Sequence, residues 1–406
     1  MTDDRPSAAA EARATTAPGA WRVRKLTEGP ALGGGTAHSY YDIPVLDAAG
    51  RRILAHRLPF TGRHPTPEDA VAVGIVACDG EGPDNWTPLG ESRAWSWQQG
   101  PLAQWVAGGP RVVWNDREGD RIVARLHDTE TGGTRTLPGQ VYAVDPTGRS
   151  ALSLDMTRLD RLRPGYGYPG GPEGAMPKRP ADDGVWTMDL ETGERRLILS
   201  VARAAAFLDR RRGWRDRLAR LAGRMHYWFN HAKIAPGGGR FTVKLRWRRI
   251  GAGWDDRQGV SLTCGMDGTD LRLLAPATSH VIWRDDRHLY FWQRDALRLY
   301  EDTAPEGTRL AQLAPGVVTQ NVHIRHLDVE ARLHVLDTPY REEVELMTWD
   351  ARTGAVERIA RFAGHDPARG PFRCDLHPCP SADGRRIALT SLQGGVREVH
   401  LAERVA

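Results

Sequence analysis

Short apolar stretches separated by polar turns recur along most of the chain. Aligned at their histidines, four windows share one pattern: a turn-like or polar pair six and seven residues on, then apolar residues again about three positions later. These windows are HAKIAPGGGRF from His231, HVIWRDDRHLY from His280, HIRHLDVEARL from His323 and HPCPSADGRRI from His377. Each window predicts a strand, a tight turn and a second strand.

Three further windows fit the same frame without the histidine. They are IPVLDAAGRRIL from Ile43, QWVAGGPRVVW from Gln104 and VYAVDPTGRSAL from Val141. Several units continue with a third strand and a DxxTG turn, as in GVWTMDLETGERRLI at 184–198. Seven repeats of about four strands each predict an all-β fold, a seven-bladed β-propeller.

The spacing of the repeats also predicts the domain organisation. We expect a disordered leader at 1–19 and a single propeller domain over 20–406. A loop and helix insertion of about 156–227 should lie between blades 3 and 4, with its helix across about 201–222. The strand-like segment at 20–29 has no inner strands of its own, and the last blade lacks a fourth strand. We therefore predict that the N-terminal strand closes the last blade and leaves no free edge.

Composition and charge exclude some classes of function. The 44 glycines, 27 prolines and 14 tryptophans suit short strands and turns. The 56 basic and 51 acidic residues are interleaved, which favours a mixed solvated surface and argues against nucleic-acid binding. Neither a signal peptide nor an apolar run of about 20 residues is found, so we expect a cytoplasmic protein without a membrane span. Cys374 and Cys379 lack a second cysteine pair and are interpreted as packing residues.

The four aligned histidines are the main candidate for a functional site. In a propeller, the innermost strand of each blade begins at one face of the central channel. The histidines at 231, 280, 323 and 377 should therefore form a ring there, suited to metal binding or acid–base chemistry. Asp375 lies two residues before His377 and so on the same side of the strand. The alternative is that the histidines only line a wet channel.

The motifs FNHAKIAPGGGRF, SHVIWRDDRHLYFW and CDLHPCPSADGRRIALTS, with the blade pattern over most of 20–405, resemble the oligogalacturonate lyases. That group of seven-bladed propellers belongs to the wider set of TolB-like repeat propellers. Residues 94–120 and 163–168 resemble a bacterial branch related to it. The resemblance implies β-elimination on a uronate-containing oligosaccharide, assisted by a divalent cation, typically Mn²⁺.

Carried over by position, the resemblance makes His280 and His377 metal ligands and His231 the base. Asp375 stands where the group has a second histidine, and the glutamine ligand of the group falls near Phe372. An aspartate is a competent hard ligand for Mn²⁺ or Ca²⁺. With His323 at the equivalent blade position, the predicted metal ligands are His280, His323, Asp375 and His377.

Elimination from a uronate removes the C5 proton, whose acidity is low because the adjacent carboxylate is already negative. A divalent ion or a bidentate arginine can neutralise that charge. A neutral imidazole such as His231 can take the proton. Tyr166 or Tyr168, on the glycine-rich insertion, are candidates for protonating the leaving oxygen, with Arg163 beside them.

Candidate residues for substrate binding are Trp97, Gln98, Gln104, Arg117 and Arg161. The expected partner is an acidic oligosaccharide. Two alternatives remain open: a non-catalytic TolB-like propeller that binds a protein or a glycan, and a glycoside hydrolase on the same scaffold. The sugar, the linkage, the metal, the oligomeric state and the role of the insertion as lid or interface are not determined by the sequence.

Overall fold

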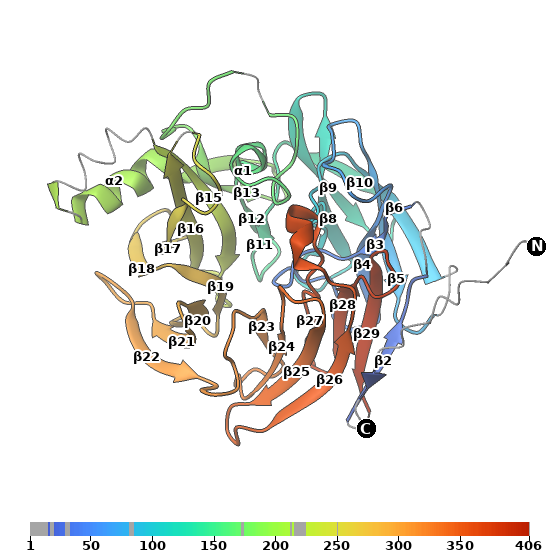
Figure 1. Ribbon diagram of the computed structural model, residues 1–406. Coiled ribbons are helices and arrows are strands. Elements are labelled where there is room, and N and C mark those ends of the chain that lie inside the picture. Colours follow the sequence, from blue (N-terminus) through green and yellow to red (C-terminus); the bar gives the residue numbers. More distant parts are fainter. Residues whose placement is uncertain are drawn as a thin grey trace, which may run out of the picture.

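The computed structural model describes residues 15–16, 20–28, 33–80, 85–171, 174–211, 213–214, 225–249 and 251–405. Within these residues the strands form seven antiparallel sheets arranged around a central axis (Figure 1). The first strands of neighbouring blades contact one another from β11 through β27, so the first strand of each blade lies nearest the axis. The predicted all-β, seven-bladed propeller is confirmed.

The first three blades are four-stranded and follow the chain order. Blade one holds β3 (Gly35–Ala37), β4 (Arg52–Leu58), β5 (Val71–Ala77) and β6 (Trp86–Ser92). Blade two holds β7 (Gln104–Trp105), β8 (Arg111–Glu118), β9 (Arg121–Asp128) and β10 (Thr134–Leu137). Blade three holds β11 (Ala143–Val144), β12 (Ser150–Ser153), β13 (Gly184–Asp189) and β14 (Arg195–Ser200).

The remaining blades carry the histidine windows. Blade four holds β15 (Met225–Ile234), β16 (Arg240–Arg249), β17 (Gln258–Gly265) and β18 (Arg272–Pro276). Blade five holds β19 (Thr278–Trp283), β20 (His288–Gln293), β21 (Ala296–Glu301) and β22 (Thr308–Leu313). Blade six holds β23 (Ile324–His326), β24 (Leu333–Asp337), β25 (Val344–Asp350) and β26 (Val356–Phe362). Blade seven holds β27 (Cys379–Pro380), β28 (Arg386–Ser391) and β29 (Glu398–Arg404).

The N-terminal segment pairs with the strand nearest the C-terminus. Strand β2 (Trp21–Lys25) pairs antiparallel with β29 and is the outer strand of blade seven, where the blue and red ribbons meet in Figure 1. Strand β1 (Thr15–Thr16), which belongs to the predicted leader, pairs with β26 of blade six. The other leader residues, 1–14 and 17–19, lie outside the described part of the chain. Strand β2 covers the edge of β29 and is the fourth strand of blade seven, as the sequence predicts.

The insertion at about 156–227 has two parts, because β13 and β14 lie within it. The first part connects β12 to β13 and contains α1 (Met156–Leu162), whose N-cap Asp155 accepts bonds from the backbone N–H groups of Thr157 and Arg158. The second part contains α2 (Val201–Arg211), between blades three and four. The rest of the helix expected to residue 222 falls almost entirely on residues outside the described part.

The buried side chain of Arg158 fixes α1 against blade four. Its Nε donates to the carbonyl of Tyr227 at 2.9 Å, and its Nη2 donates to the carbonyl of Pro177 at 2.8 Å. The loop after α1, which carries the predicted tyrosines, therefore starts from a rigid position. The short 3-10 helix η2 (Pro367–Phe372) lies near the middle of the ring in Figure 1.

The tight turns of the hairpins fall where the sequence predicts them. In blade seven the turn at Asp383-Gly384 has Gly384 at φ 65°, and a Cβ there would lie 2.0 Å from the carbonyl oxygen of Leu327. Only glycine fits this close approach between blades six and seven. Cys374 and Cys379, which flank His377, are both buried and free, as are the other two cysteines. Among the described residues, no helix has the length and apolar character needed to cross a membrane.

Candidate metal and active site

Three of the aligned histidines share an unusual backbone conformation. His231 on β15, His280 on β19 and His377 just before β27 have φ values of 54°, 49° and 50°. The pairing register of the inner strand breaks between Asn230 and Lys233 and between Ser279 and Ile282. A left-handed backbone at a non-glycine residue costs on the order of 1–3 kcal/mol and is found preferentially at functional sites. Such bulges re-aim a side chain relative to the regular alternation of a strand.

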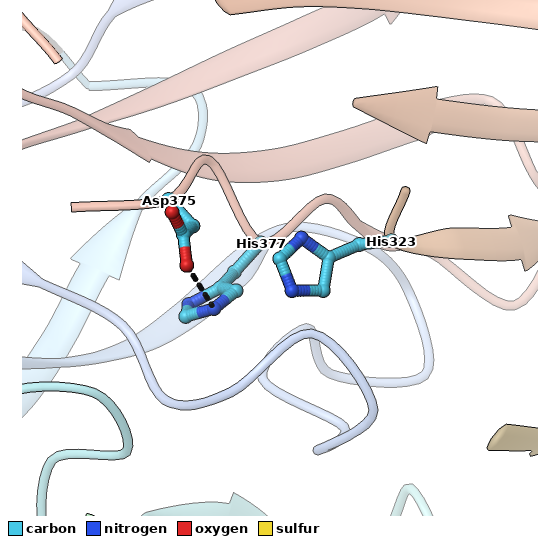
Figure 2. Close-up of side chains that lie close together, drawn as sticks. All are labelled: His323, Asp375 and His377. Atoms are coloured by element: carbon cyan, nitrogen blue, oxygen red, sulfur yellow. Dashed lines mark ion pairs between the residues drawn. The ribbon is translucent and has the colours of Figure 1, made fainter. Parts of the chain in front are cut away.

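His323, Asp375 and His377 form the group that could hold a metal ion. One candidate ligand atom from each residue lies within 4.8 Å of the others. Asp375 Oδ2 is 3.9 Å from His377 Nε2 (Figure 2). His323 comes from the start of blade six, whereas Asp375 and His377 come from the segment that enters blade seven. The group therefore bridges two neighbouring blades.

The hydrogen bonds of His323 fix its tautomer. Its Nδ1 lies 3.0 Å from both carboxylate oxygens of Asp337, and both side chains are fully buried. Since a carboxylate accepts hydrogen bonds, Nδ1 carries the proton and Nε2 presents its lone pair. A carboxylate behind a histidine is the usual support for a metal-binding imidazole.

His280 lies beside this group but is not part of it. Its ring centroid is 4.0 Å from that of His323, and its Nδ1 donates to the carbonyl of Val322 at 2.8 Å. Nε2 is therefore the acceptor, and the hydroxyl of Tyr340 donates to it at 3.3 Å. The predicted ligand His280 is thus next to the predicted ligands His323, Asp375 and His377, with the correct nitrogen unprotonated.

The chemistry of these groups suits a divalent cation. His323 Nε2, His377 Nε2 and Asp375 Oδ2 are buried without a hydrogen-bond partner among the described residues. Burial, with a smaller effect of neighbouring cationic and imidazole groups, holds the pKa values of His280 and His377 well below 6.5, so both rings are neutral at pH 7. The same Oδ2 of Asp375 forms an ion pair with Arg373 Nη2 at 3.2 Å, so this oxygen lacks a hydrogen bond but has a cationic neighbour. Two imidazoles and a carboxylate are a common ligand set for Mn²⁺ and similar ions.

The residues Tyr40 and Tyr41, which sequence reasoning missed, fill the channel between the histidines. The ring of Tyr40 stacks on His231 with centroids 5.1 Å apart and meets His377 edge-on at 4.5 Å. The ring of Tyr41 lies 4.7 Å from that of His323. Both tyrosines precede the first inner hairpin, outside the repeating windows. The only signal in the sequence is the paired aromatics in HSYYD at 38–42.

His231, the predicted base, is held by hydrogen bonds at both ring nitrogens. Nδ1 lies 3.1 Å from the hydroxyl of Tyr142, which itself donates to Gln99. Nε2 lies 3.1 Å from Arg163 Nη1, and a guanidinium only donates, so Nε2 is unprotonated. Burial and the charge of Arg163 hold the pKa of His231 well below 6.5. His231 is therefore a neutral imidazole whose free electron pair faces an arginine.

Tyr166, but not Tyr168, reaches this cluster. The Tyr166 ring centroid is 5.8 Å from that of His231, and its hydroxyl accepts from Arg373 Nη2 at 2.8 Å. Burial raises the pKa of Tyr166, but Arg163 and Arg373 outweigh burial and the net shift is downward. Tyr168 is fully buried, and its hydroxyl accepts from Asn115 of blade two at 2.8 Å. Its contacts support the fold and do not place it at the cluster.

An excess of positive charge surrounds the aromatic side chain of Trp254. The guanidinium groups of Arg163, Arg246 and Arg257 lie 5.1, 5.4 and 3.9 Å from the Trp254 ring centroid. Within the described residues, Arg163 and Arg246 form no ion pair with a carboxylate. Uncompensated guanidinium groups beside the base favour an anionic ligand.

The predicted substrate-binding residues are mostly placed elsewhere. Gln104 is fully buried and bonds to the carbonyls of Leu102 and Tyr142. Arg117 of β8 donates to the carbonyls of Pro169 and Gly170 in the insertion. Arg161 donates to the carbonyl of Gly174 at 2.8 Å. These hydrogen bonds hold the insertion and the blades together.

Trp97 and Gln98 line the small space beside Asp375 and His377. Trp97 is only 3% exposed, and its Nε1 donates to the carbonyl of Arg63, so the ring is part of the core. Gln98 donates to the carbonyls of Pro371 and Arg373 at 3.0 and 2.8 Å. Gln98 thus fixes the segment that leads to Asp375. Neither side chain offers a face on which a sugar ring could stack.

The space at the cluster is small. A cavity of about 20 Å³ lies between His231 and His280, and one of about 10 Å³ lies beside Asp375 and His377. A volume of this size holds at most a water molecule or an ion. A sugar would require the side chains that cover the histidines to move.

Comparisons with known proteins agree with the architecture. No protein-family model matches the sequence, and a search of curated proteins finds no match. Among solved structures, the chain is similar to an oligogalacturonate lyase in complex with manganese, at 15% identity and a TM-score of 0.59, with 97% of this chain and 96% of that chain covered. An oligogalacturonate lyase from Vibrio parahaemolyticus is similar at 12% identity and a TM-score of 0.57, with 96% of each chain covered.

TolB from Acinetobacter baumannii also matches, at 12% identity and a TM-score of 0.39, with 88% of this chain and 82% of that chain covered. At 12% and 15% identity, the similarity to the two lyases establishes the fold alone. The chain therefore has the seven-bladed propeller fold that the oligogalacturonate lyases also have.

Proposed function

We propose that this protein is a metal-assisted lyase that cleaves uronate-containing oligosaccharides by β-elimination in the cytoplasm. The observation that carries the proposal is the buried ligand group of His323, Asp375 and His377 beside a neutral His231. This histidine accepts from Arg163, which has no ion-pair partner among the described residues. The fold shared with the oligogalacturonate lyases, one of them in complex with manganese, supports it.

In this proposal His323, Asp375 and His377 hold the divalent cation, with His280 available as a further ligand. When bound, Mn²⁺ or a similar ion would supply positive charge that stabilises the enolate-like intermediate. The rest of the chemistry belongs to side chains of this chain. Arg163 and Arg246 lie where they can bind the substrate carboxylate, because neither is neutralised by a carboxylate of the described residues.

Proton abstraction follows from the bond between Arg163 and His231. When Arg163 turns its N–H groups to the substrate carboxylate, it releases Nε2 of His231, 3.1 Å away. The freed electron pair can then take the C5 proton, while Nδ1 keeps its bond to Tyr142. Coupling of the two events would activate the base only when a uronate is bound.

Protonation of the leaving oxygen is assigned to Tyr166. Its hydroxyl is bonded to Arg373, and the Arg163 guanidinium lies 3.3 Å from the centroid of its ring. Both cations lower the pKa of the phenol and so favour proton donation. The ring centroids of Tyr166 and the base His231 are 5.8 Å apart.

The proposal is tested by metal analysis paired with an absorbance assay. The purified protein, loaded with Mn²⁺ and dialysed, should retain about one ion per chain. It should also produce the 235 nm absorbance of an unsaturated uronate from acidic oligosaccharides. Chelation should abolish this activity, and readdition of Mn²⁺ should restore it.

Two variants and a control separate the roles. His377→Ala should lose both metal and activity, whereas His231→Ala should keep the metal and lose activity. His334→Ala, which removes an equally buried histidine in blade six, should change neither. Activity that survives chelation would exclude the metal role. Metal binding without turnover of any acidic oligosaccharide would favour a glycan-binding propeller, and cleavage without absorbance at 235 nm would favour a hydrolase.

A further inference from the structure

A second, larger cavity lies at the opposite end of the inner strands. Its volume is about 360 Å³, and it is lined by the later residues of the inner strands β7, β11, β15, β19 and β23 and by the turns that follow them. In blades four, five and six the aligned histidine precedes the lining residues along the chain, so the cavity lies further along the inner strands than the histidine cluster. A volume near the lower end of the range for ligand pockets, about 300–1,000 Å³, suits a single small molecule.

Charged groups converge on this cavity. Asp42 and Lys233 form a pair at 3.2 Å, with both side chains only 7% exposed. Arg325 also lines the cavity and forms no ion pair within the described residues, although its Nη1 donates to the carbonyl of Tyr41 at 2.9 Å. The lining therefore holds two acidic side chains, Asp42 and Asp145, and two basic ones, and Arg325 is the basic side chain that forms no ion pair within the described residues.

Two buried polar atoms of the lining residues lack partners. Asp42 Oδ1 accepts no hydrogen bond, and Arg325 Nε donates none, within the described residues. A buried polar group without a hydrogen bond is destabilising, so a ligand that bonds to these groups would gain affinity from them. The remaining acidic side chain, Asp145, is already occupied by Thr147 and Ser150.

The walls present apolar surface. Trp105 and Trp283 line the cavity, and their indole N–H groups already donate to the carbonyls of Val45 and Lys233, both at 3.0 Å. Ile43 and Ile282 add aliphatic surface. What these residues offer a ligand is therefore contact with C–H groups rather than further hydrogen bonds.

We propose that this cavity is a second binding site for a small hydroxy acid, such as a monomeric sugar acid. Arg325 binds the carboxylate, Asp42 accepts a hydroxyl, and the indole and aliphatic side chains pack on the carbon skeleton. The cavity is too small for an oligosaccharide, so the site differs in ligand size from the histidine cluster.

Tyr41 separates the two sites. Its hydroxyl accepts from Lys233 Nζ at 2.7 Å, and its ring contacts His323 and His280 on the other side. The second site thus needs neither the metal nor the base, and its existence does not rest on the proposed lyase activity.

Calorimetric titration of the chelated full-length protein with D-galacturonate tests this site. We expect binding of one molecule per chain, with galactose and acetate binding at least tenfold more weakly because each lacks one of the two recognised groups. Arg325→Gln should weaken galacturonate binding at least tenfold. His377→Ala should leave it unchanged, which distinguishes this site from the histidine cluster.

A second variant guards against misfolding, because Arg325 also holds the backbone of Tyr41. Pro236→Trp places a large side chain on the exposed turn at the rim of the cavity and should abolish binding without lowering the melting temperature. Absence of galacturonate binding to the parent protein would overturn the proposal. So would binding that survives both Arg325→Gln and Pro236→Trp, or binding that His377→Ala abolishes.

Discussion

The hydrogen bond between His323 and Asp337 should control how tightly the candidate metal site binds a divalent ion. The two carboxylate oxygens lie 3.0 Å from Nδ1, and both residues are fully buried. The carboxylate fixes the Nδ1–H tautomer and makes Nε2 a stronger electron donor. Asp337→Asn preserves the size of the side chain but removes the negative charge behind the imidazole.

The expected loss of metal affinity follows from the position of Asp337, which is hydrogen-bonded to the proposed ligand His323. Loss of such a partner typically lowers metal affinity about 10–100-fold, which is about 1.4–2.7 kcal/mol of binding free energy. Asp337 also accepts from the backbone N–H of His323 at 3.0 Å. The amide oxygen of asparagine can keep that bond, so we expect the variant to fold.

Calorimetric titration of the metal-free protein with Mn²⁺ measures the change in affinity. Asp302→Asn is the matched control, because Asp302 is also buried and bonds to Arg240 and Thr263 away from the cluster. We expect the Mn²⁺ affinity of Asp302→Asn to equal that of the parent. Equal affinity of Asp337→Asn and the parent would refute the ligand role assigned to His323.

Three other predictions concern the pH response, one turn and one hydroxyl. Burial lowers the pKa to about 4 for His38, His326 and His334 and to about 3 for His56 and His400. Below pH 6.5 the unfolded chain binds protons that the folded chain does not. Stability should therefore fall by about 1.4 kcal/mol per pH unit for each histidine until the folded pKa is reached; an unchanged urea midpoint between pH 7 and pH 5 would contradict this. Gly384→Ala should destabilise the protein by roughly 2 kcal/mol or more, because of the left-handed backbone and the close carbonyl of Leu327. Gly395→Ala, at φ 85° with nothing within 4 Å, is the control in urea denaturation and should cost less. Tyr166→Phe should lower kcat about 100-fold with little change in KM, as expected for loss of a general acid. In the same absorbance assay, Tyr290→Phe, which removes a buried hydroxyl bonded to His326, should leave kcat unchanged; equal losses would rule out the role of Tyr166.

The repeating pattern of the sequence determined the fold, because each hairpin is a local structure with its own turn. The windows at Ile43, Gln104 and Val141 correspond to inner hairpins of blades one to three, although they lack the histidine. The same alignment also placed His280, His323 and His377 near one another, since equivalent positions in successive blades face one channel.

The partners of these histidines were decided only by the tertiary structure. Asp337 reaches His323 from the neighbouring strand segment, and Tyr40 enters the channel from outside the repeat, so neither follows from the repeat pattern. Tyr166 and Tyr168 are two residues apart on one loop, yet only the first meets the cluster. Loop conformation depends on long-range contacts such as those of Arg158, which have no sequence period.

For the substrate-binding residues, too, the sequence predicted less than the tertiary structure shows. The sequence indicated that arginines and tryptophans would bind the substrate. Of the residues it named, Trp97 is buried and Arg117 holds a loop. The arginine and tryptophan that lie near Arg163 are Arg246 and Trp254. The sequence by itself thus determined the blades, their turns and the column of histidines, which depend on local periodicity. The tertiary structure decided which charged and aromatic side chains meet them, because those contacts join residues distant along the chain.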